Sequence, residues 1–132
     1  MNLSIEKVKD SYGRCLDSED FIGRFYEIFL EKDAEIKAKF VNTNFDGQKK
    51  LLRHAILSMI LFAGDGLAGI VTLEKIRETH DPKHMDIRPW QYAFWKDSLL
   101  QTVEEKDPKF DEETKQAWSY VIDTGVKFIT TY

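Results

Sequence analysis

The sequence predicts an all-α fold of about seven or eight helical segments of unequal length. Apolar residues recur at intervals of three and four along most of the chain, which is the spacing of a helix with one buried face. No segment of useful length alternates strictly between apolar and polar residues, as a half-buried strand does. Proline is confined to positions 82, 89 and 108. Because proline is poorly tolerated inside helices, these positions are expected to mark their boundaries.

The composition restricts the class of protein. The 132 residues suit one domain, taken as residues 1–132, and are too few for two ordinary domains. With 42% hydrophobic and 32% charged residues, the chain resembles neither a disordered tail nor a membrane protein. The formal charge of −4 is spread without a basic block, so nucleic acid is not expected as a partner. A single cysteine excludes an internal disulfide framework.

The chain also lacks recognisable targeting signals. Its first residues show no signal-peptide pattern. The longest nearly uncharged stretch, residues 55–63, is much shorter than the roughly 20 residues that span a bilayer. We therefore expect a cytoplasmic protein without a membrane partner.

Three helices are expected before residue 41. The first covers about residues 5–16. Asp17 or Ser18 is expected to cap the second, because short polar side chains accept hydrogen bonds from the free N–H groups at a helix start. The apolar face of this second helix carries Phe21, Ile22, Phe25 and Phe29. Asp33 is expected to start a short third helix that ends near Phe40.

A loop and two helices are expected in the middle of the chain. Residues 41–47 hold two Asn, a Thr, an Asp and a Gly, which predicts a loop. The long helix that follows ends at Gly64 and Gly66. Its apolar stripe consists of Leu52, Ala55, Ile56, Met59, Ile60 and Ala63. The helix that contains His80 must stop near Asp81, because the residue before a proline avoids helical geometry.

Two long helices are expected at the C-terminal end. Pro89 suits the first turn of one, which continues through Val103. The Asp107-Pro108 pair forms the next turn, and Asp111 caps the final helix.

Four parts of the sequence, in this order, resemble landmarks of one family. Residues 25–30 (Phe-Tyr-Glu-Ile-Phe-Leu) and 35–40 (Glu-Ile-Lys-Ala-Lys-Phe) resemble the B helix and CD corner of bacterial single-domain globins and of the haem domain of flavohaemoglobins. Gln48 resembles the distal glutamine of these proteins. His80 with residues 86–92 (Asp-Ile-Arg-Pro-Trp-Gln-Tyr) resembles the proximal histidine and the start of the G helix, and Trp118 resembles the H-helix tryptophan. The likeness covers nearly the whole chain.

The resemblance implies a globin fold built around a haem pocket. It implies haem b as the cofactor and a five-coordinate iron that binds a diatomic gas such as oxygen, nitric oxide or carbon monoxide. It also implies that His80 is the axial ligand of the iron.

The position of His80 is compatible with this role. His80 lies four residues after Ile76 and seven after Leu73, so the three share one helix face. From this helix alone, a half-buried histidine bonded to a backbone carbonyl remains an alternative. His84 is the nearest rival, but Pro82 separates the two histidines, and His84 is expected in an exposed loop.

The resemblance assigns the opposite side of the pocket to residues earlier in the chain. Tyr26 and Gln48 would offer hydrogen-bond donors to a bound gas, with Leu52 beside Gln48 over the haem. Phe40 would pack against the porphyrin edge. The alternatives are that Tyr26 and Phe40 are ordinary core aromatics and that Gln48 lies on the surface.

His54 is not expected to be a ligand, although it lies on the same helix as Gln48. Six residues correspond to about 240° around the helix, at roughly 100° per residue. His54 would share a polar face with Lys50 and Ser58.

One feature departs from the flavohaemoglobin pattern. Tyr92 matches the tyrosine that supports the proximal histidine in that group, but the accompanying glutamate would fall near Tyr132, where the sequence has no equivalent. No glycine-rich dinucleotide motif is present. Any electrons are therefore expected from an external reductase.

Three functions of different classes follow. The first is reversible binding of oxygen, and of nitric oxide or carbon monoxide, for oxygen transport, storage or gas sensing. The second is a nitric oxide dioxygenase that depends on a separate reductase. The third is a haem-free, globin-like regulatory module, which His80, Tyr26 and Gln48 argue against. The sequence does not separate the first two, because both use the same pocket.

Overall fold

The computed structural model describes residues 2–80, 83 and 87–131, and within these ranges the regular secondary structure is entirely helical. The helices are α1 (Asn2–Asp17), α2 (Phe21–Leu30), α3 (Ala34–Lys39), α4 (Phe45–Gly64), α5 (Ile70–His80), α6 (Pro89–Lys106) and α7 (Glu112–Ile129). The predicted all-α class is confirmed, with seven helices in the described part of the chain.

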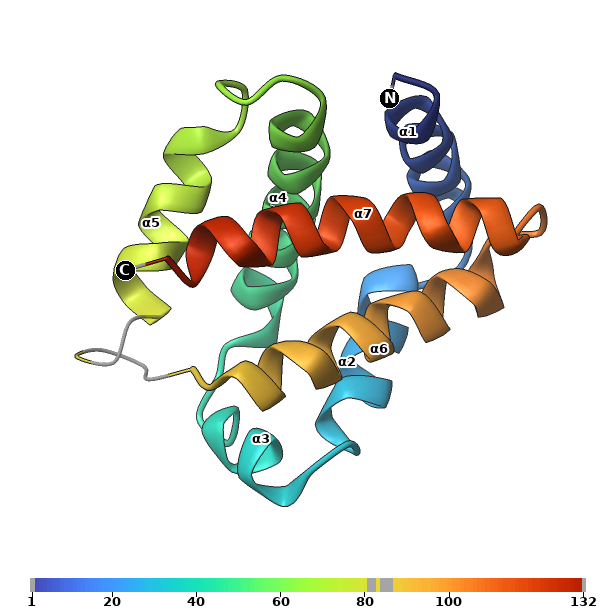
Figure 1. Cartoon of the computed structure of the whole chain (residues 1–132). Coiled ribbons are helices and arrows are strands. Elements are labelled where there is room, and N and C mark those ends of the chain that lie inside the picture. Colours follow the sequence, from blue (N-terminus) through green and yellow to red (C-terminus); the bar gives the residue numbers. More distant parts are fainter. Residues whose placement is uncertain (1, 81–82, 84–86, 132) are drawn as a thin grey trace.

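The helices pack across one another rather than as a parallel bundle. Helix α7 crosses α1, α4 and α5 and contacts all three (Figure 1). Helix α6 packs against α2 and also contacts α1 and α7. The short α3 follows α2 at the end of the molecule away from α1, and the end of α7 lies beside α5 (Figure 1).

The core lies where these helices cross. Its largest fully buried side chains are Trp118, Phe25, Ile36, Ile56, Ile60, Leu73, Leu99 and Ile122. Burial of a large apolar side chain stabilises the fold by about 1.5–3 kcal/mol. Because these side chains come from α2 to α7, the core ties distant parts of the sequence together.

Two glycines allow close approaches to α4. A Cβ atom at Gly125 of α7 would lie 2.7 Å from Cγ of Met59. Gly69, just before α5, has a φ of 81°, and a Cβ atom there would collide with the carbonyl oxygen of Ser58. Residues with a Cβ atom are strained at this φ, whereas glycine is not. Gly69 therefore allows α5 to begin directly against α4.

A buried polar network joins α1, α6 and α7. Asp107, at the end of α6, accepts hydrogen bonds from Ser11 Oγ at 2.6 Å and from Arg14 Nε at 2.6 Å. Trp118 Nε1 donates to Ser11 Oγ at 2.9 Å. Burial alone would raise the pKa of Asp107, but the hydrogen bonds from Arg14, Ser11 and the Lys109 N–H, with the charge of Arg14, hold it below its usual value.

Several predicted helix boundaries are confirmed. The side chains of Asp33 and Asp111 cap α3 and α7, and Pro89 begins α6. Helix α4 ends at Gly64 and α5 ends at His80.

The predicted cap of the second helix is wrong. Helix α1 continues to Asp17, and the Ser18 hydroxyl donates to the carbonyl oxygen of Cys15. Asp20 caps α2 instead, from the left-handed conformation with a φ of 49°, and its side chain accepts from the N–H of Gly23. This conformation is uncommon outside glycine and is not evident from the spacing of apolar residues.

The predicted loop over residues 41–47 is too long. Helix α4 begins at Phe45, so Phe45, Asp46 and Gly47 are helical. The Asn44 side chain accepts from the N–H groups of Asp46 and Gly47 at 3.1 and 3.5 Å. Asn and Asp are common both in loops and at helix starts, so composition could not distinguish the two.

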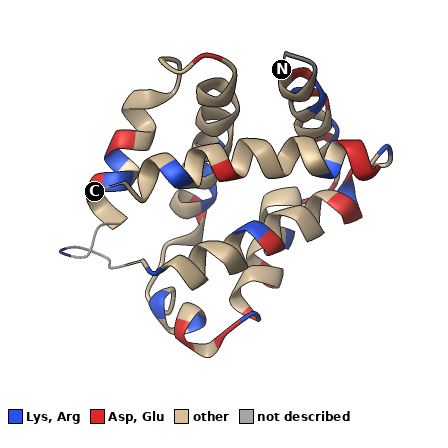
Figure 2. Ribbon diagram, in the orientation of Figure 1, with Lys and Arg blue, Asp and Glu red and all other residues tan. Residues whose placement is uncertain are grey.

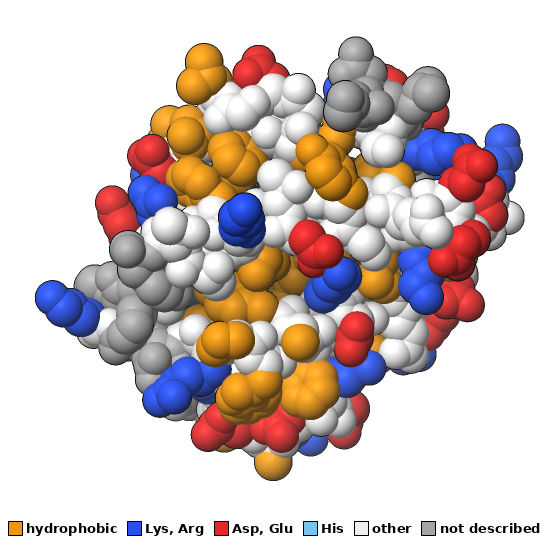
Figure 3. All heavy atoms as spheres, in the orientation of Figure 1, with side chains coloured by type: hydrophobic (Ala, Val, Ile, Leu, Met, Phe, Trp, Pro, Cys, Tyr) orange, Lys and Arg blue, Asp and Glu red, His pale blue; other side chains and the backbone are white. Residues whose placement is uncertain are grey.

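Charged residues of both signs are distributed along the helices (Figure 2). Acidic residues gather where α6 ends and α7 begins (Figure 2). On the face shown in Figure 3, apolar side chains are exposed in several places between polar and charged ones. Among the described residues, no helix is both long and apolar enough to cross a membrane.

Candidate functional site

His80 and Tyr92 form one half of the candidate site. His80 is the last residue of α5, and Tyr92 lies in the first turn of α6. The Nδ1 atom of His80 lies 3.1 Å from the Tyr92 hydroxyl oxygen. Leu73 is buried and Ile76 is packed against the core, so the helix face that carries His80 is apolar, as predicted.

The surroundings of His80 favour a neutral imidazole. The side chain is partly buried, and this burial lowers its pKa. The neutral form of the ring keeps a nitrogen lone pair, which is what a metal ion requires. Because Tyr92 contacts Nδ1, the other ring nitrogen, Nε2, is the one suited to an axial bond.

Tyr26 and Gln48 form the other half of the site. The buried Tyr26 of α2 donates a long hydrogen bond of 3.4 Å to the backbone carbonyl oxygen of Gln48, in the first turn of α4. Burial raises the pKa of Tyr26 to about 12, although this hydrogen bond partly opposes the shift. Tyr26 is therefore a neutral donor at physiological pH, and its hydroxyl faces the Gln48 backbone rather than the amide side chain.

Phe40 joins Tyr26 in an aromatic cluster. Their ring centroids are 6.0 Å apart, and both rings contact Phe45, at 5.4 Å from Tyr26 and 6.1 Å from Phe40. The sequence does not single out Phe45, because its composition predicts a loop over residues 41–47. The signal that could have revealed it is Asn44, which caps the helix that Phe45 begins.

Leu52 lies one helical turn after Gln48 and is buried in the core. Helix α4, which carries Gln48 and Leu52, packs against α5, which carries Ile76 and His80. The fold therefore places the two halves of the candidate site on neighbouring helices.

His54 does not take part in this arrangement. His54 is exposed, and its Nε2 atom contacts Thr72 Oγ1 of α5 at 3.1 Å. The expected polar face around His54 is only partly correct, because Ser58 is buried beneath Gly69. His84 lies outside the described residues.

The side chains present fit a haem better than a bare metal ion. In the described part of the chain, no group of three or more His, Cys, Asp or Glu side chains could hold a metal. A haem needs only one axial side chain, because the porphyrin supplies four ligands to its iron. One neutral imidazole, apolar neighbours and a neutral hydroxyl donor meet that requirement.

Comparisons with known proteins agree with this description. The globin family model matches residues 23–129. The chain is also similar to a solved structure from Pseudomonas aeruginosa PAO1, described as structurally highly homologous to a human haemoglobin. That protein is 37% identical, with a TM-score of 0.92, and the match covers 98% of this chain and 97% of the other. No curated protein matches the chain.

Neither match is described as a flavohaemoglobin, so that narrower resemblance stays a prediction. The family itself is clear, because the globin model spans most of the sequence and the solved structure matches nearly all of it. The chain belongs to the globin family, whose members normally bind haem.

Proposed function

We propose that this chain binds haem b through His80 and reversibly binds oxygen, and also nitric oxide or carbon monoxide, for oxygen transport, storage or gas sensing. The observation that carries the proposal is the contact of 3.1 Å between His80 Nδ1 and the Tyr92 hydroxyl, on the apolar side of α5. Membership of the globin family supports the same assignment.

On the proximal side, His80 would hold the iron through Nε2. When bound, haem would supply an iron that can take up a diatomic gas. With Nε2 as the ligand, Nδ1 would carry the ring proton and donate a hydrogen bond to the Tyr92 hydroxyl oxygen. Tyr92 thereby fixes the plane of the imidazole ring and makes the histidine a stronger ligand.

On the distal side, this chain offers neutral hydrogen-bond donors in apolar surroundings. The Tyr26 hydroxyl is buried, and its present acceptor is 3.4 Å away, which is a weak hydrogen bond. A gas ligand that gains negative charge would compete well for this proton, because hydrogen bonds to charged groups are the stronger ones. The side-chain amide of Gln48 is a second donor.

The apolar residues would enclose the porphyrin. Leu52 from α4, Ile76 from α5 and Phe40 from the end of α3 are all part of the core or packed against it. Their surfaces exclude water and thereby strengthen the polar contacts inside the site.

The visible spectrum of the purified protein tests the proposal. We expect a Soret band in the ferric and ferrous forms, and a shifted band after addition of oxygen or carbon monoxide. A protein that stays colourless after addition of haemin would contradict the proposal and favour the haem-free regulatory module. The nitric oxide dioxygenase alternative uses the same residues and stays open.

A further inference from the structure

The first turn of α4 holds Tyr26 at both ends of its side chain. Phe45, the first residue of α4, meets the Tyr26 ring edge-to-face, with ring centroids 5.4 Å apart. Three residues later, the backbone carbonyl oxygen of Gln48 accepts a hydrogen bond from the Tyr26 hydroxyl at 3.4 Å. The ring and the polar end of Tyr26 are therefore both in contact with the same helical turn.

Phe45 and Phe40 together form a wall beside the Tyr26 ring. Their rings are stacked at an interplanar angle of 24°, with centroids 6.1 Å apart. The Tyr26 ring meets both at steep angles, 73° to Phe45 and 60° to Phe40. Edge-to-face contacts are favourable because the positive edge of one ring lies against the negative face of the other. Since rotation of the Tyr26 ring would break both contacts, the wall restricts the direction in which its hydroxyl points.

The position of Phe45 is itself fixed. Its side chain is partly buried and packs against the core. Asn44 caps the turn, because its side chain accepts from the N–H groups of Asp46 and Gly47. The Asn44 carbonyl oxygen also accepts from the N–H of Gln48 at 3.0 Å. The cap keeps this turn helical, so Phe45 and the Gln48 carbonyl group stay in a fixed relation to each other.

The direction of the Tyr26 hydroxyl matters for a gas ligand. Hydrogen bonds weaken steeply when donor, hydrogen and acceptor depart far from a line. Bound oxygen gains negative charge, whereas bound carbon monoxide gains little, so oxygen depends more strongly on a well-directed donor. A residue that fixes Tyr26 would therefore favour oxygen over carbon monoxide.

We propose that Phe45 is a positioning residue that directs the Tyr26 hydroxyl toward bound oxygen and so sets the selectivity for oxygen over carbon monoxide. The inference rests on the proposed function, with Tyr26 as a donor to the gas. Phe45 has no hydrogen-bond donor in its side chain, so it acts through the ring of Tyr26. Replacement of Phe40 would disturb the porphyrin contact as well, which makes Phe45 the residue at which the effect can be separated.

The release rates of oxygen and carbon monoxide from the haem-loaded full chain test the inference. In Phe45→Leu we expect oxygen release to be about 2- to 10-fold faster, the range that the loss of one aromatic pair allows. Carbon monoxide release should stay within about twofold of the parent, because its hydrogen bond contributes little. In a Tyr26→Phe background, Phe45→Leu should change oxygen release by less than about twofold, because no hydroxyl remains to be positioned.

Phe62→Leu is the matched control. It makes the same substitution on the same helix, and Phe62 is also partly buried in an aromatic pair, with Phe128, whose ring centroid lies 5.0 Å away. Loss of this pair should leave the release rates of both gases unchanged.

A measurement without haem tests the contact between the two rings. In urea unfolding of the full chain before haem is added, Phe45→Leu and Tyr26→Leu together should destabilise less than the sum of their separate effects. The expected coupling is about 2- to 10-fold in the unfolding equilibrium constant. Strictly additive effects would contradict the ring contact.

Three results with haem would overturn the inference. Oxygen release from Phe45→Leu at the parent rate, in a protein whose Tyr26→Phe variant releases oxygen faster, would refute it and leave the proposed function intact. Equal acceleration of both gases, or the same acceleration in the Tyr26→Phe background, would show that Phe45 acts on the size of the pocket. A chain that takes up no haem would refute the proposed function itself, so the two failures are distinguishable.

Discussion

The Nδ1 atom of His80 lies 3.1 Å from the hydroxyl oxygen of Tyr92, twelve residues further along the chain. The two residues belong to α5 and α6, so the contact joins the end of one helix to the start of the next. It fixes the imidazole at the one place where the sequence predicts an axial ligand.

Replacement of His80 should remove stable haem binding. We expect His80→Ala to lose the Soret band after gel filtration and to melt at a lower temperature than the parent, because haem binds only the folded state. His54→Ala is the control and should retain haem, since His54 is exposed and its ring nitrogen contacts the hydroxyl of Thr72 on the outside of α5. Normal haem retention by the His80 variant would refute the axial assignment.

Tyr92→Phe should keep the fold but weaken the axial bond. Loss of the hydroxyl removes the partner of Nδ1, and loss of such partners costs about 10- to 100-fold in metal-site affinity. We expect faster transfer of haem to an acceptor protein and a lower iron–histidine stretching frequency by resonance Raman spectroscopy. Tyr120→Phe removes an exposed hydroxyl and should change neither measurement. Identical frequencies in the two variants would mean that Tyr92 does not act on the ligand.

Tyr26→Phe should accelerate oxygen release. A hydrogen bond to a charged partner contributes about 1.5–3 kcal/mol, which corresponds to roughly 10- to 150-fold in rate if the bond is lost on release. Stopped-flow mixing with dithionite measures this rate. A change smaller than about twofold would mean that Tyr26 stays with the Gln48 carbonyl and that the Gln48 amide is the main donor.

The Asp107 network should make the fold sensitive to acid. The pKa of Asp107 is lower in the folded chain than in the unfolded chain, so its ionised form stabilises the fold. The stabilisation is complete at a pH above the pKa of Asp107 in the unfolded chain, about 3.9. It is lost as the pH falls through the lower pKa that Asp107 has in the folded chain. In urea unfolding at fixed haem content, Asp107→Asn should be about 2–4 kcal/mol less stable at neutral pH, because Arg14 loses its partner.

The difference between the parent and Asp107→Asn should narrow as the pH falls below about 4. Asp17→Asn provides the control, because Asp17 is exposed at the end of α1. A gap between the parent and Asp107→Asn that is the same at all pH values would show that Asp107 acts through packing and not through its charge.

Gly69→Ala should destabilise the fold much more than Gly66→Ala. At Gly69 a side chain would meet both the positive φ and the Ser58 carbonyl, whereas at Gly66 nothing lies within 4 Å of an added Cβ atom. We expect a loss of about 1–3 kcal/mol for Gly69→Ala and a change within about 0.5 kcal/mol for Gly66→Ala. Thermal unfolding measures both. Equal melting temperatures would mean that α5 can shift away from α4 without cost.

The sequence by itself determined the helical class, most helix boundaries and the face on which His80 lies. These features are local. The period of apolar residues defines a helix and its buried side, and Asp33, Pro89 and Asp111 act on helix starts within a few residues of themselves. The positions of Leu73, Ile76 and His80 on one face follow from helical geometry alone.

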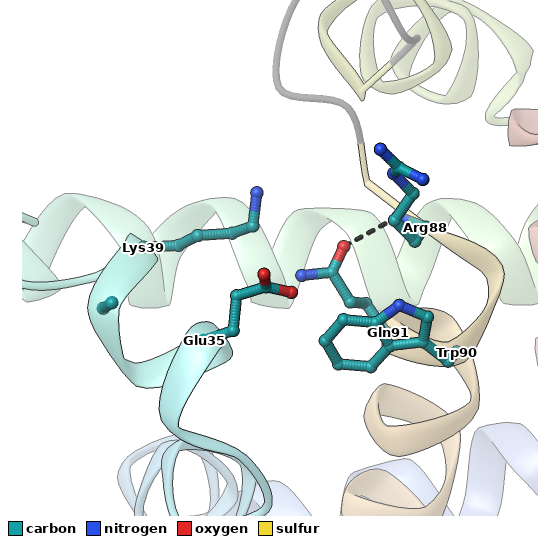
Figure 4. Close-up of a pocket in the computed structure, with 6 residues that line it drawn as sticks. Glu35, Lys39, Arg88, Trp90 and Gln91 are labelled. Atoms are coloured by element: carbon teal, nitrogen blue, oxygen red, sulfur yellow. Dashed lines mark hydrogen bonds between the residues drawn. The ribbon is translucent and has the colours of Figure 1, made fainter.

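Only the tertiary structure decided which partners these residues have. The Tyr26 hydroxyl meets the backbone of Gln48, and Asp107 joins Ser11 and Arg14 across most of the chain length. Gln91 looks like an ordinary polar residue in the sequence, yet it is buried and, with Glu35 and Arg88, lines a pocket between α3 and the start of α6 (Figure 4). Such contacts depend on how the helices cross. The crossing is determined by packing between residues far apart in the sequence, such as that of Gly69 against Ser58, and the local spacing of apolar residues does not predict it.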